Sequence, residues 1–142
     1  MKTVQQMLDA KPSQIFSVTG DSSVLSGLHY MMEGNISALL IVENEVLTGI
    51  FTERDYARKI ILHGKSSAET TIKEVMTANP ITVSPQDSID LCMKIMTDKH
   101  IRHLPVMADG ELLGMVSIGD VVKFIIEDQK QTISQLESYI SS

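Results

Sequence analysis

The sequence predicts a mixed fold of the α/β (α+β) class, in which two β-α-β-β-α repeats pack sheet to sheet with pseudo-twofold symmetry. Three observations predict it. The chain matches itself at a constant offset, each copy alternates short apolar strands with helical patterns, and one copy cannot bury both faces of its strands. The chain has 142 residues, the length of one ordinary domain, so both copies are expected to share one globule.

The internal repeat has an offset of 65 residues, which is the separation between Asp55 and Asp120. Its register runs without a gap from about Val18 to Ile61 in the first copy. Upstream, Pro12 matches Pro80 at an offset of 68, so the first copy carries three additional residues there. Further identical pairs are Ser23/Ser88, Met31/Met96, Ile36/Ile101, Leu39/Leu104, Leu47/Leu112, Gly49/Gly114 and Ile60/Ile125.

Each copy begins with a short strand, at 15–18 in the first copy and at 81–83 in the second. A helix follows each strand. In the first copy Asp21 or Ser22 is expected to open this helix, and in the second copy the segment 85–87 does so. These positions hold Pro, Ser and Asp, which favour the starts of helices.

Two apolar strands come next, at 38–42 and 46–51 in the first copy, joined by a short polar turn. The matching turn of the second copy, 108–111, contains the Asp-Gly pair that favours a tight hairpin. A second helix is then expected from Thr52 in one copy and from Ser117 in the other. These elements complete the β-α-β-β-α order.

The repeats set the boundaries of the chain's parts. The polar, Gly- and Ser-containing segment after His63 is expected to be a linker. The C-terminal tail has Ile133, Leu136 and Ile140 on one helical face, which either packs on the same chain or contacts a second copy. The predicted parts are an N-terminal helix or lead-in at 1–14, repeat 1 at 15–62, a linker with a short helix at 63–79, repeat 2 at 80–126, and a C-terminal helix at 127–142.

Composition argues against several classes of partner. The net charge of −6 disfavours nucleic acid, since phosphate backbones require a basic surface. The longest fully apolar run is 38–42, too short to cross a membrane. The single cysteine, Cys92, fits a reducing compartment, and with a polar N-terminus it predicts a cytoplasmic protein. Cys92 lies on an apolar helix face, so it is interpreted as a buried packing residue and not as a nucleophile.

The segments 49–55 and 114–120 are the candidate functional motif. Each has a hydroxyl residue at the end of a strand, Thr52 or Ser117, and a carboxylate three residues later. This is the pattern of a helix capping box, which serves structure only. It also fits a ligand site, because free N–H groups at a helix start attract phosphate and a carboxylate can accept both hydroxyls of a ribose. Duplication of the corner favours ligand binding.

With these features the chain resembles a pair of CBS domains, the tandem module named after cystathionine β-synthase and also called a Bateman module. Both copies end in the hxGhhT/SxxD pattern, and the segment 101–106 (IRHLPV) matches the entry to a CBS strand. The resemblance covers the chain from Pro12 to about Ile126. It is most similar to stand-alone bacterial CBS-pair proteins.

The resemblance implies two pockets, each built from both copies. Asp55 and Asp120 would hold riboses, Arg54 and Arg102 would meet phosphate, and His103 would touch a ligand phosphate. One pocket would use Ser17, the backbone of Ile36, Ser37 and Ala38, and Arg102, Ser117 and Asp120. The other would use Thr82, the backbone of Ile101, Arg102 and His103, and Thr52, Arg54 and Asp55.

The copies differ at two positions that bear on these pockets. Gly119 stands where the first copy has Arg54, so the Arg54 pocket is expected to favour the more highly charged or larger ligand. Leu40 stands where the second copy has Pro105, the proline that the family pattern places before the second strand and a further candidate ligand-binding residue. The pockets are therefore not equivalent.

The resulting functional prediction is a regulatory module that binds AMP, ADP, ATP or NAD(H), senses energy or redox state and transmits it to a partner. Neither a catalytic cofactor nor a metal is expected. A homodimer is expected, with a regulated enzyme or transporter as a further partner and with neither nucleic acid nor membrane. The alternatives are a pair that binds S-adenosylmethionine, a ligand-free structural adaptor and, least favoured, an enzyme. The sequence lacks a Walker loop, GxSxG and HExxH.

Overall fold

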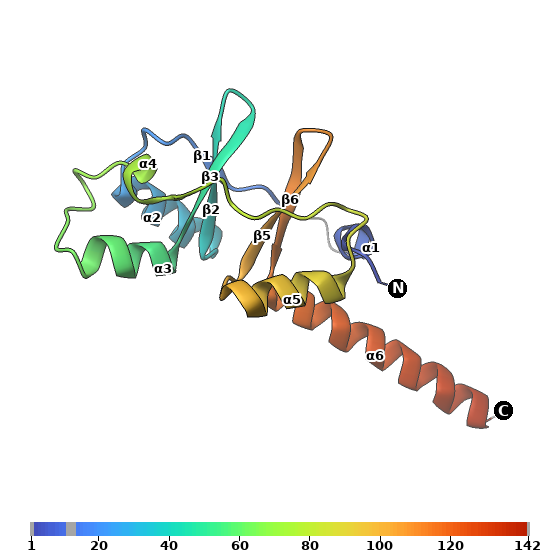
Figure 1. The fold of residues 1–142 in the computed structure, drawn as a ribbon. Helices are drawn as coiled ribbons and strands as arrows, with labels where there is room; N and C mark the ends of the chain where they lie inside the picture. Colours follow the sequence, from blue (N-terminus) through green and yellow to red (C-terminus); the bar gives the residue numbers. More distant parts are fainter. Residues whose placement is uncertain (1, 11–13, 142) are drawn as a thin grey trace.

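The computed structural model of the protein describes residues 2–10 and 14–141, and Figure 1 shows its fold. It contains two repeats whose β-hairpins lie next to each other, so the predicted mixed fold is confirmed. Pro12 lies outside the described residues, together with parts of the predicted lead-in at 1–14.

Repeat 1 comprises β1 (Ser17–Val18), α2 (Val24–Gly34), β2 (Ala38–Glu43), β3 (Val46–Thr52) and α3 (Glu53–Asp55), which continues as the π-helix η1 (Tyr56–Ile61). β1 runs parallel to β2, and β2 runs antiparallel to β3. The predicted helix start at Asp21 or Ser22 is wrong. Ser23 caps α2, because its side chain accepts the Ser26 N–H at 3.0 Å.

Repeat 2 reproduces this arrangement with α5 (Ile89–Lys99), β5 (His103–Ala108), β6 (Glu111–Ser117) and α6 (Ile118–Ser141). Ser88 caps α5 as Ser23 caps α2, so this helix also begins later than predicted. The hairpin of each repeat has a register shift at the same place, between Ile41 and Val42 and between Val106 and Met107. The predicted strand at 81–83 is reduced to a bridge between Val83 and Val106.

The segments that precede the repeats are exchanged between them. α1 (Val4–Ala10) buries Val4 in the core of repeat 2, and α4 (Ile72–Val75) buries Ile72 in the core of repeat 1. Bridges join Thr3 to Ser88 and Ser23 to Thr71. Thr3 and Thr71 stand 68 residues apart, as Pro12 and Pro80 do, so the two short helices are also copies of each other.

The hydrophobic core has a centre in each repeat and a contact layer between them. β4 (Thr77–Ala78) pairs with β3, which makes the strand order of this sheet β1-β2-β3-β4, while β5 and β6 form the second sheet. Between the sheets lie Ala38, Leu40 and Ile50, packed with Leu47, Leu112 and Met115. Burial of this layer makes the two repeats one globule.

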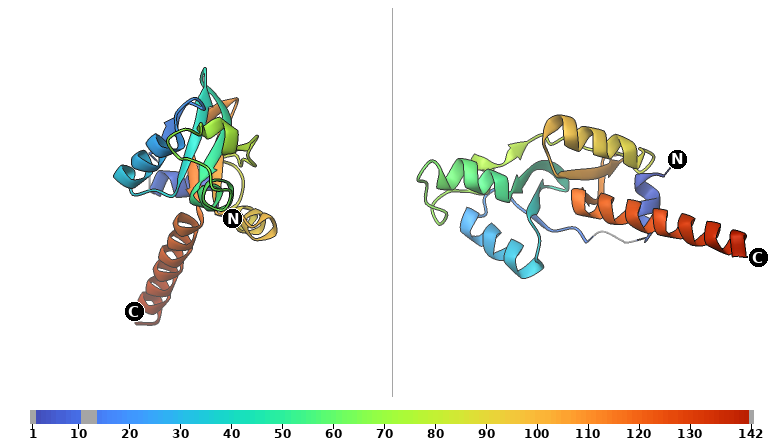
Figure 2. Two further views of the ribbon diagram at one scale, coloured as in Figure 1. Left: turned by 90° about the vertical axis from the view of Figure 1, so that its left-hand side faces the viewer. Right: turned by 90° about the horizontal axis from the view of Figure 1, so that it is seen from below.

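The C-terminal helix and the second helix of repeat 2 form one element, α6. α6 has 24 residues and begins directly after β6, so the tail continues the second helix of repeat 2. Both views in Figure 2 show its C-terminal half running away from the rest of the molecule. Within 2–10 and 14–141 the structure has no helix long and apolar enough to span a bilayer.

Candidate functional site

A cavity of about 900 Å³, here called the large cavity, opens where the two repeats meet. Both repeats contribute polar groups to it. Repeat 1 supplies Asn35, Ser37 and Glu53, and repeat 2 with the helix that follows it supplies His103, Ser117, Asp120, Lys123 and Glu127. Its apolar wall includes Met7, Leu8, Phe16, Ile36, Met115 and Phe124. A space of this size, mostly apolar with a few polar groups, is typical of small-molecule sites.

The corner Ser117–Asp120 lines the large cavity at the start of α6. The Asp120 N–H donates to Ser117 Oγ at 3.1 Å, and the Ser117 N–H donates to Asp120 Oδ2 at 3.3 Å. This is the reciprocal geometry of a capping box. The two interpretations of the motif therefore do not compete, since one half-buried carboxylate both caps the helix and faces the cavity.

A second cavity of about 320 Å³, here called the small cavity, adjoins the large one. It is lined by Ser37, Thr52, Glu53, Arg54, Arg102 and His103. Ser37, Glu53 and His103 line both cavities, so these three residues form the wall between them. Arg54 also donates to the carbonyl oxygen of His100, which holds its guanidinium group against repeat 2.

His103 lies between the two cavities, with its Nε2 atom 3.0 Å from Ser37 Oγ. Burial lowers the pKa of its imidazole below 6.5, and of the nearby charges Asp120 raises that pKa while Arg102 lowers it. The ring is therefore neutral at pH 7. Positive charge at the small cavity comes from Arg54 and Arg102, both of which are exposed.

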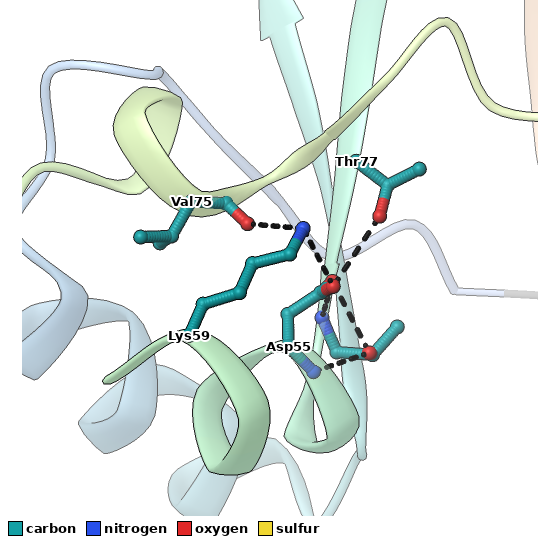
Figure 3. Close-up of polar contacts among 5 residues, drawn as sticks. Asp55, Lys59, Val75 and Thr77 are labelled. Atoms are coloured by element: carbon teal, nitrogen blue, oxygen red, sulfur yellow. Dashed lines mark hydrogen bonds and ion pairs between the residues drawn. The ribbon is translucent and has the colours of Figure 1, made fainter. Parts of the chain in front are cut away.

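The corner Thr52–Asp55 has the same capping geometry but different surroundings (Figure 3). Asp55 Oδ2 accepts from the Thr52 N–H at 3.0 Å and from Thr52 Oγ1 at 3.2 Å. Asp55 Oδ1 accepts from Thr77 Oγ1 at 3.3 Å and pairs with Lys59 Nζ at 3.1 Å. Lys59 also donates to the Val75 carbonyl oxygen at 2.9 Å. This carboxylate ties η1 to the segment that contains α4 and β4.

The repeat itself explains this difference between the corners. Lys59 of repeat 1 corresponds to Phe124 of repeat 2, which lines the large cavity. One copy thus has a cation that neutralises the motif carboxylate, and the other has an aromatic ring on the cavity wall. The asymmetry expected from Arg54 and Gly119 therefore extends to Asp55 and Asp120.

The predicted site residues fall into two groups. Ile36, Ser117 and Asp120 line the large cavity, Thr52, Arg54 and Arg102 line the small one, and Ser37 and His103 line both. The remainder are absent from the described residues that line either cavity. Of these, Ala38, Asp55 and Pro105 are buried, Ser17 and Ile101 are half-buried, and Thr82 is exposed.

Sequence reasoning missed the contribution of α1 to the large cavity, because Met7 and Leu8 stand far in the chain from repeat 2, against whose core they pack. A signal was present. Thr3 bonds to Gln6 as Thr71 bonds to Glu74, and both pairs have the Thr-x-x-Gln/Glu spacing of a capping box. At an offset of 68 this match marks α1 as part of the repeat.

Comparison with known proteins identifies the family. The family model described as CBS domain matches residues 11–62 and 72–127. The "CBS domain-containing protein CBSX3, mitochondrial" of Arabidopsis thaliana is 42% identical over 127 residues, which are 86% of this chain and 62% of that protein. This chain therefore spans less than two thirds of that relative.

Solved structures agree with this match. A putative signal-transduction protein with CBS domains from Burkholderia ambifaria MC40-6 is 46% identical, with a TM-score of 0.87 over 90% of this chain and 96% of that one. The CBS domain pair of protein MJ0100, in complex with 5′-methylthioadenosine and S-adenosyl-L-methionine, is 25% identical, with a TM-score of 0.79 over 90% of this chain and 98% of that one. Because the family model matches both repeats, the chain belongs to the CBS domain family and is a tandem CBS-domain protein.

Proposed function

We propose that this protein is a regulatory module that binds an adenosine-containing ligand in the large cavity. The observation that carries the proposal is the Ser117–Asp120 corner, which opens on a cavity of about 900 Å³ built from both repeats. This volume lies within the range of roughly 300–1,000 Å³ found for ligand sites. The related CBS pair of MJ0100, complexed with two adenosine compounds, supports this ligand class.

The lining residues suggest a role for each part of such a ligand. Asp120 would accept the ribose hydroxyls, and the backbone at Ile36 and Ser37 would read the adenine edge. Phe16 and Phe124 would pack against the base. These groups belong to different repeats, so the bound ligand would hold the repeats together.

A phosphorylated adenosine fits the small cavity better than S-adenosylmethionine does. Arg54 and Arg102 line that cavity beside the shared wall of Ser37 and His103. Guanidinium groups bind phosphate in a forked geometry, and they repel a sulfonium cation. We therefore favour AMP, ADP, ATP or NAD(H), with the phosphates toward Arg54 and Arg102.

Binding would regulate through its effect on conformation. A ligand shifts an equilibrium by as much as its affinities for the two states differ, and this cavity changes whenever the repeats move relative to each other. We also propose that the protein forms a homodimer in the cytoplasm and that it regulates an enzyme or a transporter.

We propose binding without turnover. One pair of side chains has the arrangement of a nucleophile beside a base, since Ser37 Oγ and His103 Nε2 lie 3.0 Å apart. This pair therefore provides the test for turnover. A steady release of product from ATP or NAD(H), lost in a Ser37→Ala variant, would show that the protein is an enzyme.

A thermal-shift panel with AMP, ADP, ATP, NAD(H) and S-adenosylmethionine tests the proposal. A ligand at a hundredfold excess over its Kd stabilises the fold by about 2.7 kcal/mol, which raises Tm by roughly 5 to 10 °C for a domain of this size. Asp120→Asn should weaken binding at least about tenfold, because it removes a charged hydrogen-bond partner. Asp55→Asn is the matched control and should keep the ligand shift.

The outcomes separate the alternatives. A shift with S-adenosylmethionine and with no nucleotide would favour the alternative ligand. A wild-type protein that none of these compounds stabilises would be an adaptor. Equal binding by wild type and Asp120→Asn would overturn the assignment of the site. Arg54→Gln should weaken ATP more than adenosine, since adenosine carries no phosphate.

A further inference from the structure

The two cavities have linings of opposite charge. Within the described part of the chain, the charged side chains that line the large cavity are three acids and one base: Glu53, Asp120, Glu127 and Lys123. Those that line the small cavity are two bases and one acid: Arg54, Arg102 and Glu53. In a cavity, where water screens them less, such charges act strongly on a charged ligand. The proposed ligand therefore has its ribose partner, Asp120, in one cavity and the better place for its phosphates in the other.

The wall between the cavities contains a side-chain contact that joins the two repeats. Ser37 stands directly before β2 and His103 is the first residue of β5, and Ser37 Oγ lies 3.0 Å from His103 Nε2. The backbone behind each side chain is fixed. The Glu53 N–H donates to the Ser37 carbonyl oxygen at 3.1 Å, and His103 pairs with Ser117 in the β5–β6 ladder. The wall can therefore open by rotation of side chains while both hairpins keep their structure.

The Ser37–His103 pair is not repeated in the other half of the molecule. At the repeat offset of 65 residues, Ser37 corresponds to Arg102 and His103 corresponds to Ala38, and the structure describes both of these residues. The alanine side chain has no polar atom, so the equivalent positions cannot form a side-chain hydrogen bond. The repeated hairpins therefore form with or without this pair, which indicates that it serves the ligand site and not the fold.

We propose that Ser37 and His103 form a gate that selects adenosine ligands by the phosphates they carry, an inference that rests on the proposed function. With the gate closed, the two side chains bond to each other and the large cavity holds adenosine. A phosphate chain separates them and passes the wall to reach Arg54 and Arg102. His103 Nε2 then donates to a phosphate oxygen in place of Ser37. The ligand thus determines which arrangement the contact between the repeats adopts, and this differential binding is what a sensor needs.

Opening of the gate changes the charge of His103. Burial lowers the pKa of the imidazole below 6.5 in the free protein, while Asp120 acts to raise that pKa and Arg102 to lower it. The other described charged groups that line the cavities around the ring are Glu53 and Arg54 from α3 and Lys123 and Glu127 from α6. Phosphates beside Nε2 add negative charge and favour the protonated ring. ATP should therefore raise the pKa of His103, whereas adenosine should leave it low.

Affinities of the full chain for ATP and for adenosine, measured by isothermal titration calorimetry, test the gate. Ser37→Ala removes the hydrogen bond that ATP has to break, so it should raise the ratio of ATP affinity to adenosine affinity by roughly fivefold. Glu53→Gln removes an acid from the wall and keeps the Ser37–His103 bond, and it should raise the same ratio by roughly threefold. Its counterpart in repeat 2 is Ile118, so a helix can start there without the carboxylate. The control Ser138→Ala, on the exposed part of α6, should leave the ratio unchanged.

NMR spectroscopy of the histidine rings gives a second measurement. The His103 signal, assigned by its absence in His103→Gln, should titrate at a higher pH with ATP bound than with adenosine bound. An equal pKa with both ligands, or an affinity ratio that neither Ser37→Ala nor Glu53→Gln raises, would overturn the gate and leave the proposed ligand site in place. A protein that binds neither adenosine nor ATP would overturn the proposed function and the gate together. Circular dichroism of every variant controls for folding.

Discussion

At the scale of single residues, one motif has two different environments. Asp55 and Asp120 occupy equivalent places and form the same capping box, so their backbone roles follow from local sequence. The roles of their side chains differ. Lys59 and Thr77 bind the Asp55 carboxylate, whereas the Asp120 side chain lines the large cavity. Lys59 lies four residues after Asp55 on the same helical segment, so their ion pair is local, whereas the bonds to Thr77 and to the Val75 carbonyl oxygen depend on how η1 lies against α4 and β4.

Asp55→Asn tests the structural role of this carboxylate. The substitution removes the ion pair with Lys59 from a side chain that is 11% exposed. Loss of a partner at such a site should lower the free energy of unfolding by about 2 kcal/mol. Urea unfolding measures the change. Lys59→Met should cause a similar loss. The double variant should lose less free energy of unfolding than the two single variants lose together. Additive losses would mean that the two groups do not interact.

Cys92 is predicted to be unreactive in the folded protein. The residue is fully buried, as its place on an apolar helix face predicts, and desolvation raises the pKa of its thiol to about 11. Thiolate is the reactive form, so a disulfide reagent at pH 8 should label Cys92 only as the chain unfolds. Labelling as fast as in urea would contradict this.

The same thiol should make stability depend on pH. Its pKa is higher in the folded chain than the ordinary value of 9.0, so the folded state keeps the proton longer. The stabilisation is complete below pH 9.0 and is lost as pH rises toward about 11. Replacing Cys92 with Ala should remove this part of the pH dependence.

At the scale of elements, the repeat predicts which structures form, and local chemistry moves their ends. The helices α2 and α5 begin after Ser23 and Ser88, since these side chains accept a free N–H of the first turn. The expected strand at 81–83 is a bridge. Among the described residues of this segment only Val83 bonds to β5, with its N–H donating to the Pro105 oxygen and its carbonyl oxygen accepting from the Met107 N–H. Periodicity locates an element better than it locates its ends.

The hairpin turns provide a matched test of backbone conformation. Asn44 and Glu45 have φ values of 49° and 68°, and the equivalent Asp109 and Gly110 have 50° and 78°. Glycine adopts this left-handed conformation without strain, whereas Glu does not. Glu45→Gly should therefore stabilise the protein by about 1 kcal/mol in urea unfolding.

Gly110→Ala is the reciprocal variant and should destabilise the protein by about 1 kcal/mol. A Cβ atom at Gly110 would meet nothing within 4 Å, so the change reports the backbone conformation and not a steric contact. If both variants left stability unchanged, the two turns would not have the conformation described.

At the scale of the whole molecule, exchange of the short helices joins the repeats. Val4 is fully buried in a core whose other members begin at residue 83, apart from Met7 of the same helix. The repeat pattern suggested that repeat 2 is complete at 80–126, but α1 supplies part of its core and of the large cavity. Each repeat thus depends on a segment that precedes the other repeat's first strand.

Val4→Ala tests this dependence. Removing buried methyl groups and leaving a cavity should lower the free energy of unfolding by about 2 kcal/mol. Circular dichroism during urea unfolding should show one cooperative transition at a lower midpoint. The exposed neighbour Gln5 is the control, and Gln5→Ala should change stability by less than about 0.5 kcal/mol. If Val4→Ala and Gln5→Ala changed the free energy of unfolding equally, α1 would not stabilise repeat 2.

The amino-acid sequence alone predicts the two repeats, their β-α-β-β-α order and the hydroxyl–carboxylate corners, and its motifs carry the resemblance to CBS pairs. These features follow from periodicity and spacing, which are local properties. Long-range packing determines that α1 completes repeat 2, that Thr77 and the Val75 carbonyl oxygen join the Asp55–Lys59 pair, and that His103 and Ser37 separate two cavities. Such contacts join residues far apart in the chain, and their free energies arise only when the core brings those residues together.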